Sequence, residues 1–290
     1  RAMTGPARSS APARPRAARL RDRAIAAAAI ALAAALSVAY ARPYATNNQL
    51  TYLIDPLRRV EPALWRHDWL IADTTAYHPV FGVLTAPLYR LDPEGVIAFG
   101  VAQLAVMLAT YLAIARLLGA LGLGDPRARW TAFAITAGAL ALGAGRALAG
   151  TYLFAGYLQP SSLATVAWLL ALDAWIRDRP LAAGGALAIG GALHANFLVL
   201  GVGVFGLLEL ARGAGWPRRL ARVVGPSLAV LAALAPGLFS RAGAHDPALA
   251  LRLLREFAAP GHYAPARIAA WLPGLLAWAA IAWGARAALP

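Results

Sequence analysis

The residues that could do chemistry gather in one stretch, TNNQLTYLIDPLRRVEPALWRHDW, residues 46–69. Near neutral pH an ionised carboxylate can accept a proton as a general base, whereas a side-chain amide cannot. The carboxylates in this stretch and just beyond it are Asp55, Glu61, Asp68 and Asp73. They are the candidates for a base that activates a hydroxyl group.

Asp68 is the preferred catalytic residue and Asp55 the second choice. Asp68 lies between His67 and Trp69, which suits a base beside an aromatic surface on which a sugar ring stacks. Asp55 is followed by Arg58 and Arg59, whose charges would stabilise its ionised form and weaken it as a base. The alternative for Asp68 is a solvated acid at the membrane interface, near Arg66.

Polar side chains around these acids are candidates for substrate binding. Asn47, Asn48 and Gln49 either end a helix or form a hydrogen-bonding rim for a sugar or a phosphate. His78, which precedes Pro79, is either a ligand or a turn residue.

Polar residues later in the chain add to this set. Arg146 lies inside an apolar run, where it either reaches the lipid head groups or holds a phosphate in a cavity. His194 and Asn196 interrupt another apolar run and either face a polar cavity or bond between helices. His262 and Tyr263 lie between two prolines, as a donor pair on a rigid loop or as a simple turn.

Metal and cofactor chemistry is weakly represented. The chain has no cysteine, which excludes thiolate ligands, and no lysine, which excludes a P-loop lysine and a Schiff base. No pair of histidines has ligand spacing within a helix. We therefore expect no cofactor, and a divalent metal ion is the one addition that phosphate chemistry would accommodate.

The elements that hold these residues must lie in lipid. The chain has 290 residues, of which 60% are hydrophobic and only 14% charged, against about 25% charged in a typical soluble domain. Such a deficit predicts an all-α, multi-pass transmembrane bundle. Eight apolar runs predict about eight spans: 24–41, 95–115, 130–150, 158–176, 181–194, 196–211, 223–240 and 267–286.

Three of these runs have a second interpretation. The first, 24–41, ends in AYA and could be a cleaved signal peptide, although its length favours an uncleaved span. The pair 181–194 and 196–211 is divided by HAN, and each half is shorter than the roughly 20 residues of a span. They are interpreted as two short helices that meet at a polar notch, rather than one long tilted helix.

Arginine placement predicts the orientation. Seven arginines precede the first span, which predicts a cytoplasmic N-terminus. With eight spans, 17 of the 27 basic residues then lie inside, and all five histidines lie outside. The net charge of +14 is thus interpreted as a topology signal and not as a nucleic-acid surface. Asp173 lies four residues before Arg177, a helical spacing that predicts an ion pair near the inner surface. Residues 1–23 are expected to be a disordered Arg-rich cytoplasmic tail, and 24–290 a transmembrane domain that continues past the end of this sequence.

The outer side then contains a long first loop, residues 42–94. Within it, TYLIDPLRRV and EPALWRHDWL are predicted to form short amphipathic helices on the membrane surface, with Trp65 and Trp69 at interfacial depth.

This order of features resembles a known family. An apolar span, a polar pair, DW about twenty residues on, HPVF and a second span are similar to the GT-C superfamily of membrane glycosyltransferases, in particular its aminoarabinose transferase and protein mannosyltransferase branch. Later LQPS, HANF and GHYAP segments look closer to bacterial membrane proteins grouped near that superfamily. The resemblance implies a transferase in the bacterial cytoplasmic (inner) membrane that uses a polyprenyl-phosphate sugar donor at the outer face.

One departure from the family pattern bears on function. Where active relatives have an Asp-Glu pair soon after the first span, this chain has Asn47-Asn48-Gln49. Either the catalytic carboxylate lies elsewhere, or the protein binds or moves a lipid-linked glycan without transferring it. A transporter is the third alternative, but no paired broken helices in related halves indicate one.

Overall fold

The computed structural model describes most of the helical part of the chain. The residues described are 16–40, 44–45, 49–68, 78–123, 125–143, 156–211, 215–239, 248 and 252. Within these ranges the secondary structure is helical, with no β-strand, so the all-α prediction is confirmed there.

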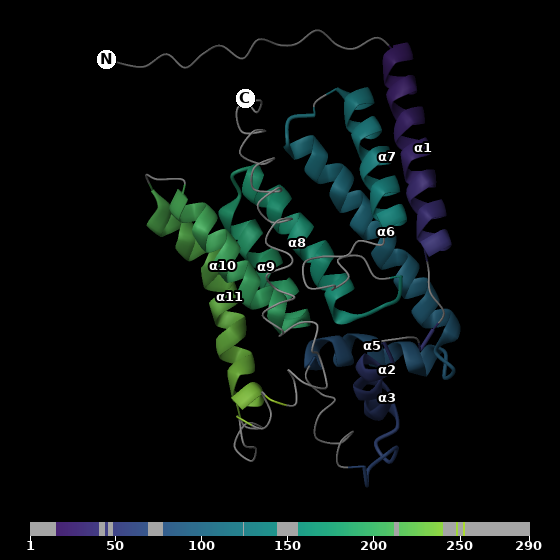
Figure 1. Cartoon of the computed structure of the whole chain (residues 1–290), viewed down its shortest axis with the longest axis vertical. Helices are drawn as coiled ribbons and strands as arrows, with labels where there is room; N and C mark the ends of the chain where they lie inside the picture. The colour runs from purple at the N-terminus through teal and green to yellow at the C-terminus, as the bar shows by residue number, and fades with distance from the viewer. Residues whose placement is uncertain are drawn as a thin grey trace.

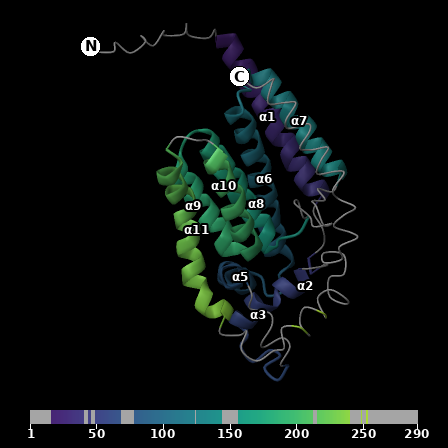
Figure 2. The ribbon, with the colours of Figure 1, turned by 60° about the vertical axis from the view of Figure 1, so that its left-hand side comes forward.

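Seven longer helices form the body of the molecule (Figure 1). They are α1 (Arg16–Tyr40), α6 (Val96–Ala120), α7 (Pro126–Gly143), α8 (Pro160–Ile176), α9 (Pro180–Leu193), α10 (Ala195–Ala211) and α11 (Trp216–Phe239). Three shorter helices, α2 (Gln49–Tyr52), α3 (Ile54–Val60) and α5 (Pro79–Leu91), lie across one end of this body (Figures 1 and 2). We call these three the cap.

Seven of the eight predicted apolar runs overlap one of the long helices. The eighth run, 267–286, lies outside the described residues. The number of spans is not confirmed. In the described part of the chain, two segments are long and apolar enough to cross a membrane, Leu20–Ala39 and Val96–Ala120. The 14 residues of α9 rise only about 21 Å, against about 30 Å for the lipid hydrocarbon core.

The polar notch between α9 and α10 is confirmed. Helix α9 ends at Leu193, and His194 has an extended backbone (φ −150°, ψ 111°) before α10 begins at Ala195. The predicted disordered tail is partly wrong, because α1 begins at Arg16. Residues 16–23 are mostly Arg, Ala and Leu, which favour a helix once the apolar run beyond them supplies the nucleus.

The first outer loop differs from its prediction in two places. The segment 61–68 is a series of turns and not a helix, with Trp65 in the left-handed region at φ 52°. The segment 79–91, expected to be loop, is the 13-residue helix α5. Its Pro79 occupies the first turn, where the missing N–H costs nothing.

Three apolar clusters hold the helices together. One joins α1, α6 and α7 around Tyr111 and Phe133, and another joins α8, α9, α10 and α11 around Phe205 and Leu187. The third ties the cap to α6 through Phe81 and Phe99. Large apolar side chains also cover the outside of the bundle, such as Ile135 at 67% exposed.

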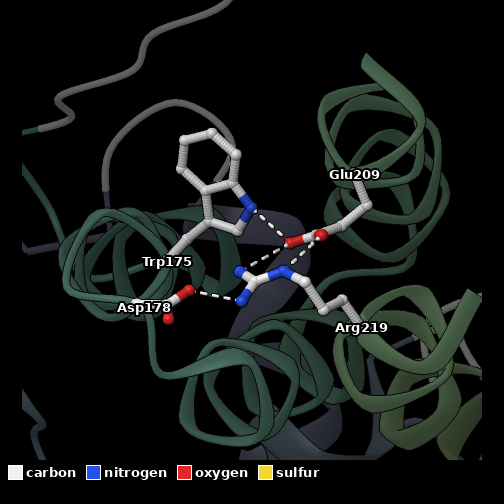
Figure 3. A network of polar contacts seen from close by, with 4 residues as sticks. All are labelled: Trp175, Asp178, Glu209 and Arg219. Atoms are coloured by element: carbon white, nitrogen blue, oxygen red, sulfur yellow. Dashed lines mark hydrogen bonds and ion pairs between the residues drawn. The ribbon is translucent and has the colours of Figure 1, made fainter. Parts of the chain in front are cut away.

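Arginine and acid pairs gather at the end of the bundle opposite the cap. The buried Asp173 accepts hydrogen bonds from Arg116 Nε at 2.6 Å and Arg177 Nε at 2.8 Å, which confirms the predicted Asp173–Arg177 helix pair. Figure 3 shows a second network, in which the fully buried Glu209 accepts from Trp175 Nε1 at 2.7 Å and from Arg219 Nε at 2.9 Å. Arg219 also pairs with Asp178, so one side chain joins the α8–α9 turn to α10 and α11.

Candidate functional site

Two histidines far apart in the sequence meet beneath the cap. His78 immediately precedes α5, and His194 lies in the link between α9 and α10, outside both helices. Their ring centroids are 4.7 Å apart. Tyr52, at the end of α2, packs edge-on against His78 at 5.3 Å. The fold thus assembles the pair from segments that only tertiary packing brings together.

Burial keeps both imidazoles neutral. Burial first, and then the neighbouring His194, lower the pKa of His78 to about 3, while a hydrogen bond with the backbone of Leu193 opposes the shift. Burial lowers the pKa of His194 to about 4. The Nδ1 atom of His194 is buried and has no hydrogen-bond partner within the described residues. At neutral pH each ring therefore offers one donor and one acceptor, and neither is an effective base.

The side chain of Gln49 is held by two hydrogen bonds to the protein backbone. Its side chain is buried, its Oε1 accepts from the backbone N–H of Ala45 at 2.8 Å, and its Nε2 donates to the carbonyl of Leu158 at 3.3 Å. Both ends of the amide are therefore engaged with backbone. Gln49 pins the start of the cap to the segment before α8, and a substrate would have to displace these bonds to reach it.

Asp55 is also held by the protein. Arg59 Nε donates to Asp55 Oδ2 at 3.0 Å, one helical turn further along α3. The carboxylate packs against Gly82 of α5 so closely that a Cβ at position 82 would come within 1.9 Å of Oδ2. Of the two arginines that follow Asp55 in the sequence, Arg59 is the one that forms an ion pair with its carboxylate.

Asp68 lies in an open hollow formed by the turns that follow α3. The described lining is Ala63, Trp65, Arg66, His67 and Asp68, and the hollow measures about 620 Å³. Trp65 is 41% exposed, which leaves part of its ring accessible. Arg66 Nε donates a hydrogen bond to His67 Nε2 at 3.0 Å. Indole, guanidinium, imidazole and carboxylate groups thus border one space.

The remaining predicted site residues fall into two groups. Asn196 is exposed in the first turn of α10, and no described contact joins it to the histidine pair. The others lie outside the described residues: Asn47, Asn48, Arg146, His262 and Tyr263. In the described ranges, no group of three or more His, Cys, Asp or Glu side chains is placed to hold a metal ion.

Sequence reasoning missed two features of this region. Tyr52 was not singled out, although it touches His78, because a tyrosine in an apolar turn carries no distinctive signal. Helix α5 was missed even though HP at 78–79 is a recognisable helix start, with proline in the first turn.

Comparison of the chain with known protein families, with curated proteins and with solved structures finds no match.

Proposed function

We propose that this protein is a multi-pass membrane glycosyltransferase that takes a sugar from a polyprenyl-phosphate carrier at the outer face of the bacterial cytoplasmic membrane. The observation that carries the proposal is the hollow at residues 63–68. It combines a partly exposed indole with a carboxylate, and a guanidinium lies on the same rim. These are the groups that a sugar ring, an acceptor hydroxyl and a leaving phosphate each require.

The membrane part of the proposal is supported by the surface of the bundle. Exposed large apolar side chains occur on α1, α6, α7, α9, α10 and α11, including Val199 at 68% and Leu207 at 68% exposed. Contiguous apolar surface of this kind is unfavourable in water and stable against lipid tails. The arginine-rich helix ends opposite the cap then face the cytoplasm, and the cap faces outward.

In the proposed reaction, Asp68 takes the proton of an acceptor hydroxyl as its oxygen attacks the anomeric carbon of the donor sugar. The bond between that carbon and the phosphate oxygen breaks, and polyprenyl phosphate leaves with the electron pair. Trp65 stacks against the sugar and Arg66 stabilises the charge that develops on the phosphate. His78 and His194 are not in the described lining of this hollow, and the reaction gives them no step.

The test is transfer of labelled sugar from polyprenyl phosphate by membranes that contain the protein. We expect Asp68→Asn to lower the transfer rate by at least a hundredfold, because general-base catalysis contributes about 10²–10⁴-fold. Glu61→Gln removes an exposed carboxylate from the same loop and should leave the rate unchanged. Full activity of Asp68→Asn at equal protein level would remove Asp68 from the mechanism.

A second candidate function is binding or movement of a lipid-linked glycan without transfer. Two described polar groups of the cap, Gln49 and Asp55, already have partners within the protein, which favours a scaffold more than a catalytic centre. This alternative predicts saturable binding of the lipid-linked sugar with no labelled product at any donor concentration. Turnover that depends on Asp68 would exclude it.

A further inference from the structure

A second hollow lies at the opposite end of the bundle from the cap, where α9 begins beside the early turns of α11. Its described lining is Arg179, Pro180, Leu181, Ala182 and Arg222, and its volume is about 280 Å³. Arg179 immediately precedes α9 and Arg222 lies on α11, so the fold, and not the local sequence, brings these two arginines to one space.

Close packing of α9 on α11 fixes this hollow. A Cβ added at Gly184 would come within 2.3 Å of the carbonyl oxygen of Arg222 and 2.8 Å of that of Val223. Only a residue without a Cβ allows the two backbones to approach this far. The backbone of Arg222 is therefore held against α9 within two turns of Arg179.

The charges in this hollow are unbalanced. Nearby arginines are matched by acids: Arg219 pairs with Glu209 and Asp178, and the Asp173 carboxylate serves two more. By contrast, neither Arg179 nor Arg222 forms an ion pair with any carboxylate among the described residues. Asp178, the acid next to Arg179, is occupied by Arg219. Two cations that border one hollow and have no acidic partner in the described part of the chain favour an anion supplied from outside it.

The lining also identifies the kind of anion. Guanidinium groups bind phosphate oxygens in a forked geometry, and the hollow lies at the first turn of α9, where the helix dipole favours negative charge. Leu181, on the rim, is 65% exposed and offers an apolar surface beside the cationic one. Charge and apolar surface together match a molecule that is anionic at one end and apolar at the other.

We propose that the hollow bordered by Arg179, Arg222 and Leu181 binds the phosphate of an anionic phospholipid head group. Free phosphate offers the same anionic chemistry but would make no use of Leu181. The site depends on insertion of the bundle in a membrane with this end toward an anionic leaflet. It does not depend on sugar transfer, and the two can fail separately.

The test uses the full chain, purified in neutral detergent, and follows its thermal unfolding. Phosphatidylglycerol should raise the midpoint by several degrees, because a ligand that binds only the native state stabilises it. Phosphatidylcholine and inorganic phosphate at the same phosphate concentration should change it little. The double variant Arg179→Gln/Arg222→Gln should lose the phosphatidylglycerol shift, and Arg179→Lys/Arg222→Lys should recover part of it.

Arg127→Gln is the matched control, since it removes an exposed arginine at the start of α7, outside the described lining of the hollow. It should keep the full shift. Equal loss in the control would overturn the site in favour of diffuse charge attraction, and so would an undiminished shift in the double glutamine variant. An equal shift from inorganic phosphate would assign the hollow to a soluble anion and overturn the lipid. Circular dichroism before heating verifies that each variant is folded.

Discussion

His78 and His194 form the most unusual contact at the scale of single residues. Two imidazoles with centroids 4.7 Å apart cannot both be protonated without strong repulsion, and their burial disfavours even one charge. His78 already uses part of its hydrogen-bonding capacity on the backbone of Leu193. The Nδ1 of His194, which has no hydrogen-bond partner among the described residues, is the ring nitrogen of the pair that could bond to a hydroxyl group.

The same contact predicts an acid-sensitive fold. The folded-state pKa of His78 is about 3 and that of His194 about 4, against about 6.5 for an unfolded histidine. Between these values the unfolded chain binds protons that the folded chain does not, so stability falls as pH is lowered from about 6.5 toward 4. Thermal unfolding of the purified protein from pH 8 to pH 4.5 measures this loss.

Substituting His78 and His194 tests whether these two residues cause the loss of stability at low pH. The double variant His78→Gln/His194→Gln should show a flatter dependence of the midpoint on pH across this window. His67→Gln, which changes an exposed histidine of the same region, should behave as the unmodified protein. An identical slope in the double variant would place the acid sensitivity elsewhere.

At the scale of elements, two glycines allow neighbouring helices to pack closely. Gly82 admits the Asp55 carboxylate between α3 and α5, and Gly184 admits the backbone of α11 onto α9. Gly185, the residue next to Gly184, has open space where a Cβ would lie. These two adjacent glycines lie in the same helix, but Gly184 packs against the backbone of α11 and Gly185 packs against nothing among the described residues.

This difference predicts opposite effects of one substitution. Gly184→Ala should destabilise the protein by about 1–3 kcal/mol, because the added methyl forces α9 and α11 apart. Gly185→Ala should be neutral or stabilise by up to about 1 kcal/mol, since alanine is the better helix former. Denaturation in detergent compares the two, and similar effects at both positions would contradict the α9–α11 contact.

The order of elements in the first outer loop was the least well predicted. The apolar and polar pattern at 61–70 suggested an amphipathic helix, but hydrogen bonds such as Leu64 N–H to Glu61 O at 3.0 Å and Asp68 N–H to Trp65 O at 3.0 Å close separate turns. Trp65 can take its left-handed conformation only if the surrounding structure offsets the strain. Nothing in the local pattern indicates that support.

At the scale of the whole molecule, the two ends of the bundle differ in chemistry. Arg116, Arg177 and Arg219 form their ion pairs at the end where α8 leads into α9 and α10 into α11. The histidine pair and the hollow beside Asp68 belong to the end that carries the cap, and Figure 1 shows these two ends of the bundle. Apolar side chains cover the bundle between them. This division suits a molecule that meets a different environment at each end.

The sequence has no cysteine, so the orientation can be tested by labelling introduced cysteines with no other thiol of the protein reacting. Glu61→Cys places a thiol at an exposed position beside the hollow, and Arg127→Cys places one at the opposite end. In intact cells, a membrane-impermeant maleimide should label position 61, and label position 127 only after the membrane is opened. The reverse pattern would invert the orientation and remove the hollow from the outer face.

The sequence by itself determined the features that depend on composition and near neighbours. It predicted the helical secondary structure of the described residues, the approximate positions of seven long helices, the break at His194 and the Asp173–Arg177 pair. Periodicity, hydropathy and i,i+4 spacing are local properties, so they can be read along the chain.

Only the tertiary structure decided which distant residues meet. It placed His194 against His78, the Gln49 amide on the Leu158 carbonyl, and Asp55 against Gly82. The first two contacts follow from how the cap folds across the ends of α8 and α9, and the third from the packing of α3 on α5. Such contacts depend on packing between segments far apart in the chain, and no property of either segment alone specifies its partner.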